Sequence, residues 1–428
     1  MTAAAAAPQP GGGGSRLNVL QVCDHLGWEG SRMHGVKRLF SWMIPRFDPA
    51  RYNVALVSLR KKDLSEETLE SMGIDISYLH KSKFDPATLT ALLKVVDRQK
   101  TDILHLHGYG ATTFGRIAGQ MRGLPTILHE HANLTDTPWF QKIADRMLAP
   151  ATDIAIAVSK STAEFVIHAR QMPPERVKVV YLGVPLEEFS RQRTMEEIAA
   201  ARHELGATPD EFVVGTVTRL HDSKGNSYLI DAAQEVLRQR PKTRFYLFGE
   251  GPLRPALEAQ AKALGLDGRF IFGGFTRDVA RTVAAFDVSV FPSLWEGTPL
   301  TVFETLAMGK PIVATDADGL VDVLTDERDA LIVPKRDAAA IARAVVRLLD
   351  SPEDRARLSV HARTTGSQYG IAAFVRKMER LYELLHDTSR RTKRQGILRA
   401  DLSFLDSDRR VSGAAESHES LQTGGTRA

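Results

Sequence analysis

Short runs rich in Val, Ile and Leu alternate with longer amphipathic stretches from Arg16 almost to the end of the chain. Parallel strands joined by crossover helices give this pattern, because such strands are covered on both faces and lack a polar side. The alternation loosens between Pro185 and Arg202 and then begins again. It predicts the α/β class, with two doubly wound, Rossmann-like domains in succession.

The expected strands of the first domain are Leu17–Val22, Asn53–Leu59, Ile74–Leu79, Asp102–His107, Pro125–His131, Asp153–Ser159 and Val177–Leu182. Those of the second domain are Phe212–Thr218, Arg244–Phe248, Phe270–Phe272, Val288–Phe291, Pro311–Thr315 and Ala330–Val333. Helical spacing is clear at Pro86–Arg98, Ser161–Arg170, Asn226–Leu237, Leu253–Leu264, Pro299–Met308, Ala338–Leu349, Glu353–Arg363 and Ile371–Leu385. Gly309 is expected as a helix C-cap.

These elements place a first domain at residues 16–187, a second at 188–370 and a last helix at 371–386. Residues 1–15 are mostly Ala, Pro and Gly, which predicts a flexible leader rather than a signal peptide. Residues 388–428 carry eight Lys and Arg against five Asp and Glu. This basic segment is expected to be disordered.

Composition excludes several classes of protein. The chain has 428 residues, of which 43% are hydrophobic and 25% charged, as in ordinary globular domains. Its net charge of +4 comes largely from the tail, so the folded part does not indicate a nucleic-acid partner. No apolar run is long enough to span a membrane, although peripheral contact with the inner membrane face stays open. The single cysteine, Cys23, is expected as a buried thiol in a reducing cytoplasm.

Ligands of open parallel sheets bind beyond the carboxyl ends of the strands, so two such sheets facing each other predict an interdomain cleft. Arg219 and Lys224 follow the first strand of the second domain and precede a helix that Asn226 could cap. A bidentate guanidinium and an ammonium at such a turn suit a phosphate. The alternative is solvated surface charge.

Gly249 and Gly251 follow the next strand in the segment Phe248-Gly-Glu-Gly-Pro252. Two glycines there permit close backbone approach to a ligand, although a simple tight turn explains them as well. Arg254 stands where a dinucleotide fingerprint needs a third glycine, and no P-loop pattern occurs. A Rossmann dehydrogenase and a P-loop nucleotidase are therefore not supported.

The segment Glu296-Gly-Thr-Pro-Leu-Thr-Val-Phe-Glu304 is the most informative. We expect Thr298 to cap a helix, Pro299 to take its first position, and backbone amides near Leu300 to point into the cleft. Glu304 lies between apolar neighbours on that helix, where a carboxylate needs ligand hydroxyls. The segment predicts a polyhydroxylated, phosphorylated ligand; the alternative is a solvated loop acid and a partly exposed helix acid.

Together these residues resemble the retaining glycosyltransferases of family 4, also called glycosyl transferases group 1. The resemblance rests on two glutamates separated by seven residues and on Arg219, Lys224-Gly225 and Phe248 to Pro252, and it covers Arg16 to Leu385. It implies the GT-B fold, in which two Rossmann-like domains face each other across a cleft. The first domain would bind the acceptor and be completed by the last helix, and the second would bind a nucleotide sugar.

The resemblance also implies roles for single residues. Arg219 and Lys224 would hold the donor diphosphate, and Glu296 with the backbone of Thr298, Pro299 and Leu300 would contact the donor sugar or phosphates. Glu304 would bind the ribose. Retention by front-face substitution, without a cofactor, a metal ion or a protein nucleophile, is implied as well, so the glutamates are not assigned as a glycosidase pair.

Four histidines alternate in pairs, His105 with His107 and His129 with His131, and each pair shares one strand face. Nothing completes a metal site of known spacing, since Glu130 points to the opposite face. The resemblance assigns His131 to the donor sugar and phosphate, while an ordinary polar strand end is the alternative.

Gly35 best matches the family's glycine-rich loop, although Trp28, Arg32 and His34 depart from its usual pattern. The helix after it carries Lys37 and Arg38 beside an apolar side. It could rest on an anionic membrane, or its apolar side could pack in the core.

The sequence therefore predicts a glycosyltransferase that moves a hexose from a nucleoside diphosphate sugar to an acceptor hydroxyl, in cell-surface polysaccharide or glycolipid synthesis. The acceptor could be a sugar, a lipid-linked molecule or another small molecule. The alternatives are a GT-B epimerase or phosphorylase, and a catalytically silent binding module.

Overall fold

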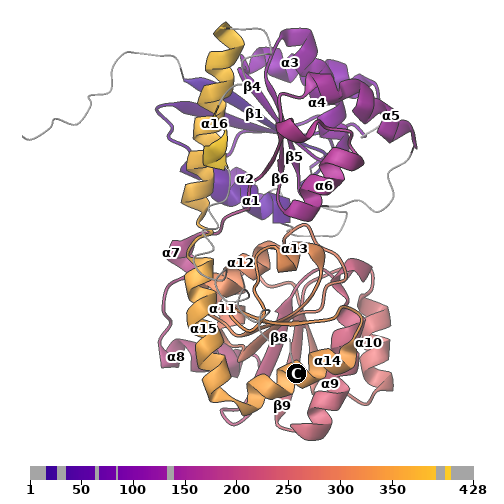
Figure 1. Cartoon of the computed structure of the whole chain (residues 1–428), viewed down its shortest axis with the longest axis vertical. Helices are drawn as coiled ribbons and strands as arrows, with labels where there is room; N and C mark the ends of the chain where they lie inside the picture. The colour runs from indigo at the N-terminus through magenta and orange to yellow at the C-terminus, as the bar shows by residue number, and fades with distance from the viewer. Residues whose placement is uncertain are drawn as a thin grey trace, which may run out of the picture.

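The structure, a computed structural model, describes residues 16–26, 35–62, 67–82, 85–132, 139–391 and 401–405. Two lobes are stacked along the long axis of the molecule, each with a parallel sheet between helices (Figure 1). The predicted leader, most of the loop before Gly35 and most of the basic tail lie outside the described residues. Among the described helices, none is both long enough and apolar enough to cross a bilayer.

The first sheet has the strand order β3-β2-β1-β4-β5-β6-β7. Its strands are β1 Leu17–Cys23, β2 Tyr52–Ser58, β3 Ile76–Tyr78, β4 Ile103–His107, β5 Thr126–Glu130, β6 Ile154–Ala157 and β7 Val177–Val179. The helices of this lobe are α1 Gly35–Met43, α2 Glu67–Ser71, α3 Ala87–Arg98, α4 Tyr109–Arg122, α5 Trp139–Leu148, α6 Lys160–His168 and, from the far end of the chain, α16 Ile371–Arg391.

The second sheet has the order β10-β9-β8-β11-β12-β13. Its strands are β8 Phe212–Val217, β9 Thr243–Phe248, β10 Phe270–Gly274, β11 Val288–Phe291, β12 Ile312–Thr315 and β13 Leu331–Val333. Its helices are α9 Asn226–Gln239, α10 Arg254–Ala263, α11 Val279–Ala284, α12 Leu300–Ala307, α13 Asp318–Val321, α14 Ala338–Asp350 and α15 Pro352–Gly366, after α7 Leu186–Phe189 and α8 Met195–Glu204 at the junction.

The prediction of two doubly wound α/β domains is confirmed, and every predicted strand is present with ends shifted by at most a few residues. The inner strands β4, β5 and β6 are buried at every position, which explains why their sequences have no polar, solvent-facing side; even Glu130, at the end of β5, is buried. Cys23 is a buried thiol in β1, as expected. In both sheets the strand order reverses beside the first strand, where ligands of this topology bind.

The region where the periodicity loosens contains two helices that the pattern did not predict. Helix α8 buries only Ala201, so its sequence carries almost no amphipathic signal. A local signal was nevertheless present, because Thr194 and Glu197 form a reciprocal capping box at its start.

The end of the chain differs from the expected disordered tail over two short stretches. Helix α16 continues to Arg391, and residues 401–405 return to pack on it. There Leu402 and Leu405 are buried, and Lys377 donates a hydrogen bond to the Leu405 carbonyl. The disorder expected from residue 388 onward therefore does not hold for these residues.

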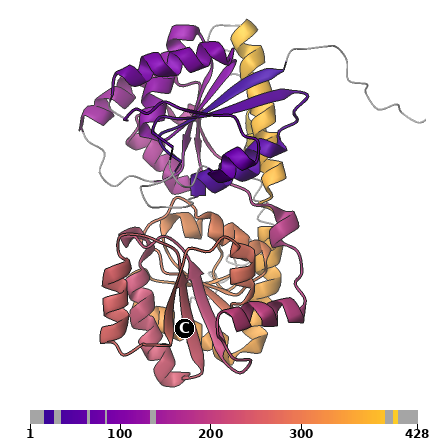
Figure 2. The same ribbon diagram turned by 180° about the vertical axis from the view of Figure 1, so that it is seen from behind.

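The chain crosses between the lobes twice, and the two crossings are hydrogen-bonded to each other. The Val184 amide donates to the Tyr369 carbonyl and the Ile371 amide donates to the Val184 carbonyl, each at 2.9 Å. After the second crossing α16 runs along the first domain, as both views of the molecule show (Figure 2).

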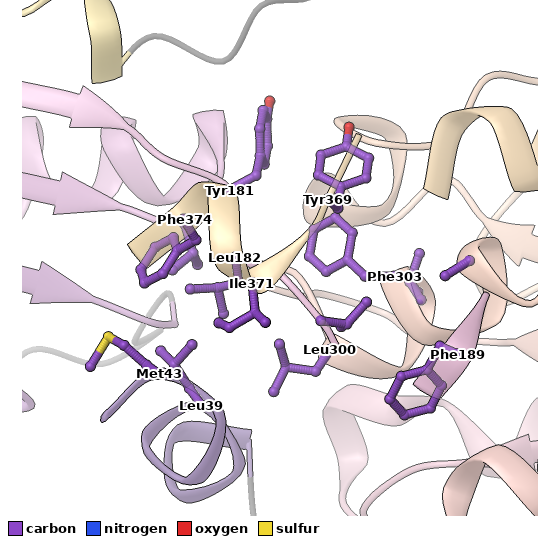
Figure 3. Packing of buried hydrophobic residues seen from close by; sticks show 14 of the residues in the cluster. Leu39, Met43, Tyr181, Leu182, Phe189, Leu300, Phe303, Tyr369, Ile371 and Phe374 are labelled. Carbon is purple, nitrogen blue, oxygen red and sulfur yellow. The ribbon is translucent and has the colours of Figure 1, made fainter. Parts of the chain in front are cut away.

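Apolar side chains from both lobes surround the crossings (Figure 3). Leu39, Met43 and Phe374 approach from the first domain, while Leu300 and Phe303 approach from the second. The two domains thus share one continuous apolar core at the junction.

Gly183 is expected to be intolerant of any side chain. A Cβ atom there would lie 2.6 Å from the carbonyl carbon of Gly370, which is backbone and cannot move aside without separating the crossings. We expect Gly183→Ala to lower the free energy of unfolding by about 1–3 kcal/mol in urea titration. Gln368→Ala, on the second crossing but with an exposed side chain, is the control; equal stability of both variants would contradict the proposed crowding.

Candidate active site

Lys224 and Glu296 form a buried ion pair at the carboxyl edge of the second sheet. The Lys224 Nζ atom lies 2.5 and 2.6 Å from the two carboxylate oxygens, and the Ser293 hydroxyl donates to Glu296 Oε1 at 2.8 Å. Burial lowers the pKa of Lys224 and nearby Arg219 adds to the shift, while Glu296 opposes it. Two residues 72 positions apart are thus brought into contact, as a common ligand would require.

Arg219 lies in the same turn but is exposed to solvent, and its guanidinium makes no ion pair with any residue that the structure describes. The helix behind it begins differently from the expectation. Gly225, with a φ of 59°, takes the N-cap position, and Asn226 is the first helical residue. Instead of capping, Asn226 donates from Nδ2 to the Arg219 carbonyl at 3.2 Å and so fixes the turn.

Gly249 and Gly251 approach protein backbone closely. A Cβ on Gly249 would lie 1.7 Å from the Thr218 carbonyl oxygen, and one on Gly251 would lie 2.3 Å from the Leu220 carbonyl oxygen. The two turns are also joined by a hydrogen bond from the Leu220 amide to the Glu250 carbonyl at 2.9 Å. The glycines therefore hold the Arg219 turn in place, and direct contact with a donor stays a prediction.

The loop before α12 corrects the predicted cap. Pro299 is the N-cap and Leu300 the first helical residue, with no side-chain cap. The Thr298 hydroxyl lies 2.5 Å from the Gly297 carbonyl and 3.3 Å from the Val158 carbonyl of the first domain. Proline has no amide hydrogen, so Pro299 cannot donate to a ligand, and Leu300 supplies the first helical amide.

Glu304 is completely buried on α12 and pairs with a residue of the other domain. Arg38 Nη2, from α1, lies 2.6 Å from Glu304 Oε1, and the guanidinium also stacks 4.7 Å from the centre of the Trp42 ring. Burial raises the pKa of Glu304, while Arg38 opposes the shift. The second oxygen, Oε2, has no hydrogen-bond partner among the described residues. The sequence analysis did not foresee this interdomain pair.

Helix α1 packs in the core, and of the two alternatives for it, membrane contact and core packing, the structure shows core packing. Lys37, Leu39, Phe40 and Met43 are all buried, so both the basic and the apolar sides of α1 face the protein interior. Gly35, at its start, lies 3.9 Å from the Leu300 side chain, measured from the position a Cβ would take. Gly35 thus reaches the second domain, whereas Trp28, Arg32 and His34 lie outside the described residues.

His131 also reaches the second domain. A Cβ on Gly297 would lie 2.4 Å from the His131 carbonyl oxygen, so the backbone after β5 packs directly on the residue that follows Glu296. The structure therefore brings His131, Lys224-Glu296 and the start of α12 to one junction between the domains.

Behind His131 the four histidines are stacked and hydrogen-bonded in a network that also contains Gln21 and Tyr382. The ring of His131 stacks on that of His129 at a centroid distance of 4.2 Å, and His105 stacks on His107 at 4.5 Å. His107 Nδ1 lies 2.8 Å from His131 Nε2, and His107 Nε2 lies 2.8 Å from Gln21 Oε1. No local motif indicates Gln21 or Tyr382, because they come from β1 and α16.

The amide of Gln21, oriented as assigned, sets the protonation of this network. Its oxygen accepts from His107 Nε2, so His107 Nδ1 accepts from His131 Nε2 and the Nδ1 atom of neutral His131 carries a free lone pair. Its nitrogen donates to the Tyr382 hydroxyl at 2.9 Å, and that hydroxyl donates to His105 Nδ1 at 2.8 Å. Burial lowers the pKa of His131 to about 4, which keeps the ring neutral near pH 7.

The ring nitrogens of His105, His107 and His129 lie within 4.8 Å of one another, close enough to share a metal ion. A metal there would break the 3.0 Å hydrogen bond between His105 Nε2 and His129 Nδ1. Glu130 does not contribute, because it turns away to pair with Arg170. The expectation that the protein needs no metal stays a prediction.

Comparison with known proteins identifies the family and the fold of the chain. Residues 211–351 match the family described as glycosyl transferases group 1, and residues 35–188 match glycosyltransferase family 4. The structure of Anabaena Alr3699/HepE in complex with UDP superposes with a TM-score of 0.74 over 86% of this chain and 100% of that one, at 21% identity. Two Rossmann-like domains of this kind define the GT-B fold of glycosyltransferases.

Curated relatives give the same class. An Escherichia coli UDP-Gal:alpha-D-GlcNAc-diphosphoundecaprenol alpha-1,3-galactosyltransferase is 27% identical over 276 residues, covering 62% of this chain and 71% of its own. A Streptomyces kanamyceticus alpha-D-kanosaminyltransferase is 29% identical over 285 residues, covering 63% and 73%. The chain belongs to the family 4 glycosyltransferases.

The buried histidines predict that stability falls in acid. Burial lowers the pKa of all four, to about 3 for His105 and about 4 for His131, whereas an unfolded histidine titrates near about 6.5. At a pH between the folded and the unfolded pKa values, these histidines are protonated in the unfolded chain and neutral in the folded chain. The free energy of unfolding should therefore drop as pH falls from about 6.5 to about 4, by up to about 1.4 kcal/mol per pH unit for each histidine.

Urea unfolding across this range measures the slope. His129→Gln removes one buried titrating group and should reduce the slope by one proton, while exposed His168→Gln should leave it unchanged. An identical slope in the wild type and the His129→Gln variant would show that the network is not neutral in the folded state.

Proposed function

We propose that this glycosyltransferase moves a hexose from a nucleoside diphosphate sugar to an acceptor hydroxyl with retention of the anomeric configuration. The observation that carries the proposal is the Lys224-Glu296 pair beside Arg219, whose guanidinium has no ion-pair partner among the described residues, opposite His131 of the other domain. We place the reaction in the cytoplasm, in the synthesis of a cell-surface polysaccharide or glycolipid. The galactosyltransferase relative, whose name specifies a UDP-sugar and a diphosphoundecaprenol-linked acceptor, supports this setting.

The diphosphate would bind at the turn between β8 and α9. Arg219 offers a bidentate guanidinium that no carboxylate of the described segments engages, and Lys224 offers an ammonium that a phosphate can take over from Glu296. Glu296 would then accept hydrogen bonds from the sugar hydroxyls while still held by Ser293. As the bond to the sugar breaks, negative charge grows on the diphosphate, and the two fixed cations stabilise it without reorganisation.

Glu304 would bind the ribose. Its Oε2 atom is buried without a partner among the described residues, which is costly unless a ligand hydroxyl donates to it. Arg38, which belongs to the first domain, pairs with the Glu304 carboxylate. The same carboxylate would therefore both bind the ribose and hold the two domains in contact.

His131 would face the donor sugar and phosphate as a neutral ring. Its unprotonated Nδ1 atom would accept a hydrogen bond from a hydroxyl group. We assign neither glutamate as a nucleophile, because Glu296 would be engaged by Ser293 and the sugar hydroxyls, and Glu304 by Arg38 and the ribose. The bond between the sugar and the diphosphate breaks, and the acceptor hydroxyl attacks the same face of the sugar, which gives retention. The departing phosphate oxygen takes the proton of the acceptor hydroxyl. The proposal assigns the stabilisation of the leaving group to Arg219 and Lys224 and includes no metal ion or cofactor.

Binding of the donor is tested by the shift in melting temperature with a panel of nucleoside diphosphates, since a ligand of the folded state alone raises stability. Arg219→Ala and Lys224→Met should abolish most of the shift, because each removes a charge-assisted phosphate contact worth about 1.5–3 kcal/mol, or roughly 10- to 150-fold in Kd. Exposed Lys262→Ala is the control. Unchanged nucleotide affinity in both site variants would overturn the phosphate assignment, and the absence of any shift in folded protein would overturn the donor site.

Retention is tested separately, by proton NMR of the anomeric position during turnover with the donor that binds. We expect the product to keep the α or β configuration of the donor. An inverted product would overturn the front-face mechanism while leaving the donor site intact.

A further inference from the structure

Helix α5 presents its apolar face to solvent. Trp139, Ile143 and Met147 follow one another at intervals of four residues and are 74%, 51% and 75% exposed, and Phe140 beside them is 44% exposed. Residues at this spacing lie one above another on a helix. Four of the large exposed apolar residues among those described therefore gather on a single helix of ten residues.

The polar face of the same helix points inward. Gln141 and Asp145 are buried, at 4% and 0% exposure. Asp145 receives an ion pair from buried Arg116, and a second from Arg170 at 3.4 Å, and Arg170 also pairs with Glu130 at 2.6 Å. An amphipathic helix normally buries its apolar side, so α5 is inverted relative to the rule.

This inverted orientation is fixed by the ion pairs. Turning α5 to bury its apolar face would leave the guanidiniums of Arg116 and Arg170 in the interior without Asp145, and breaking a buried pair in this way is strongly destabilising. Figure 1 shows α5 at the outer side of the first domain, away from the crossings. The fold thus holds the apolar face outward against the hydrophobic effect.

The exposed charges of α5 are all positive. Lys142 and Arg146 flank the apolar stripe, and the one acid of the helix, Asp145, is buried. An apolar face with tryptophan at one end and cations along its border is the composition of helices that lie in the interface of an anionic bilayer. A symmetric contact with a second copy would instead set the same cations near each other.

We propose that the outward face of α5, formed by Trp139, Phe140, Ile143 and Met147 with Lys142 and Arg146, docks the first domain onto an anionic membrane surface. The apolar side chains enter the boundary between headgroups and acyl chains, and the two cations contact lipid phosphates. A helix of ten residues cannot span a bilayer, so the attachment is peripheral. The proposal rests on α5 alone and does not require that the sugar-transfer reaction be known.

The experiment is flotation of the full chain with vesicles of phosphatidylcholine alone or mixed with phosphatidylglycerol. We expect binding to the mixed vesicles, and loss of it when Trp139→Ser, Ile143→Ser and Met147→Ser are combined. Lys142→Gln and Arg146→Gln should each weaken partitioning about fivefold, and added salt should mimic them. The control joins Met195→Ser and Val360→Ser, which are exposed apolar residues away from α5.

Each outcome decides the proposal. Equal flotation of the triple-serine variant and the wild type would overturn it, and so would a folded wild type that does not float. Self-association without lipid that the triple-serine variant abolishes would assign the face to a second copy instead. If that variant fails to fold by its melting curve, the two charge variants decide, because undiminished flotation in both would also overturn the proposal.

Discussion

The paired crossings at Val184 and Gly370 are the constraint on which the rest of the structure depends. Two hydrogen bonds join the only described connections between the domains, and the absence of a side chain at Gly183 lets them touch. With the crossings fixed, the carboxyl ends of the two sheets meet at a defined distance. That distance lets the backbone of His131 rest on Gly297 and the Arg38 guanidinium reach Glu304.

The buried carboxylates at this junction are each paired with a basic side chain. Lys224 holds Glu296 and Arg38 holds Glu304, so neither carboxylate is left as an isolated buried charge. The arrangement differs between the two pairs. The first pair lies within one domain and does not involve Arg219, whereas the second pair joins the domains. An exchange of partners at Glu304 would therefore couple ligand binding to domain contact.

Sequence reasoning recovered the strands because a strand buried on both faces leaves a local record, a run of apolar residues between turn signals. Because the strand ends were recognised, it also placed Lys224 and Glu296 in the loops after two strands and Glu304 on the helix that follows Glu296. It misplaced the cap of α12, because threonine is favoured at the N-cap and proline at the first helical position. In the structure the Thr298 hydroxyl instead donates to backbone carbonyls, including that of Val158 in the other domain, and Pro299 takes the N-cap position. Arg38, Gln21 and Tyr382 could not be found, because their partners lie on distant elements and no spacing along the chain records them.

The contact between Gln21 and Tyr382 joins residues 361 positions apart. The first domain is therefore a discontinuous unit, in which strand β1 is synthesised long before α16, the helix that completes its polar core. While the ribosome is still translating the second domain, His105 and Gln21 have no Tyr382 to bond, and the sheet face that α16 covers stays open to solvent. The first domain is therefore completed only after the second domain has been synthesised, whereas domains generally fold in order from the N-terminus. Completion of the first domain thus depends on α16. A chain that terminates before α16 would lack the helix that covers this sheet face, and its second domain would have no completed first domain to pack against.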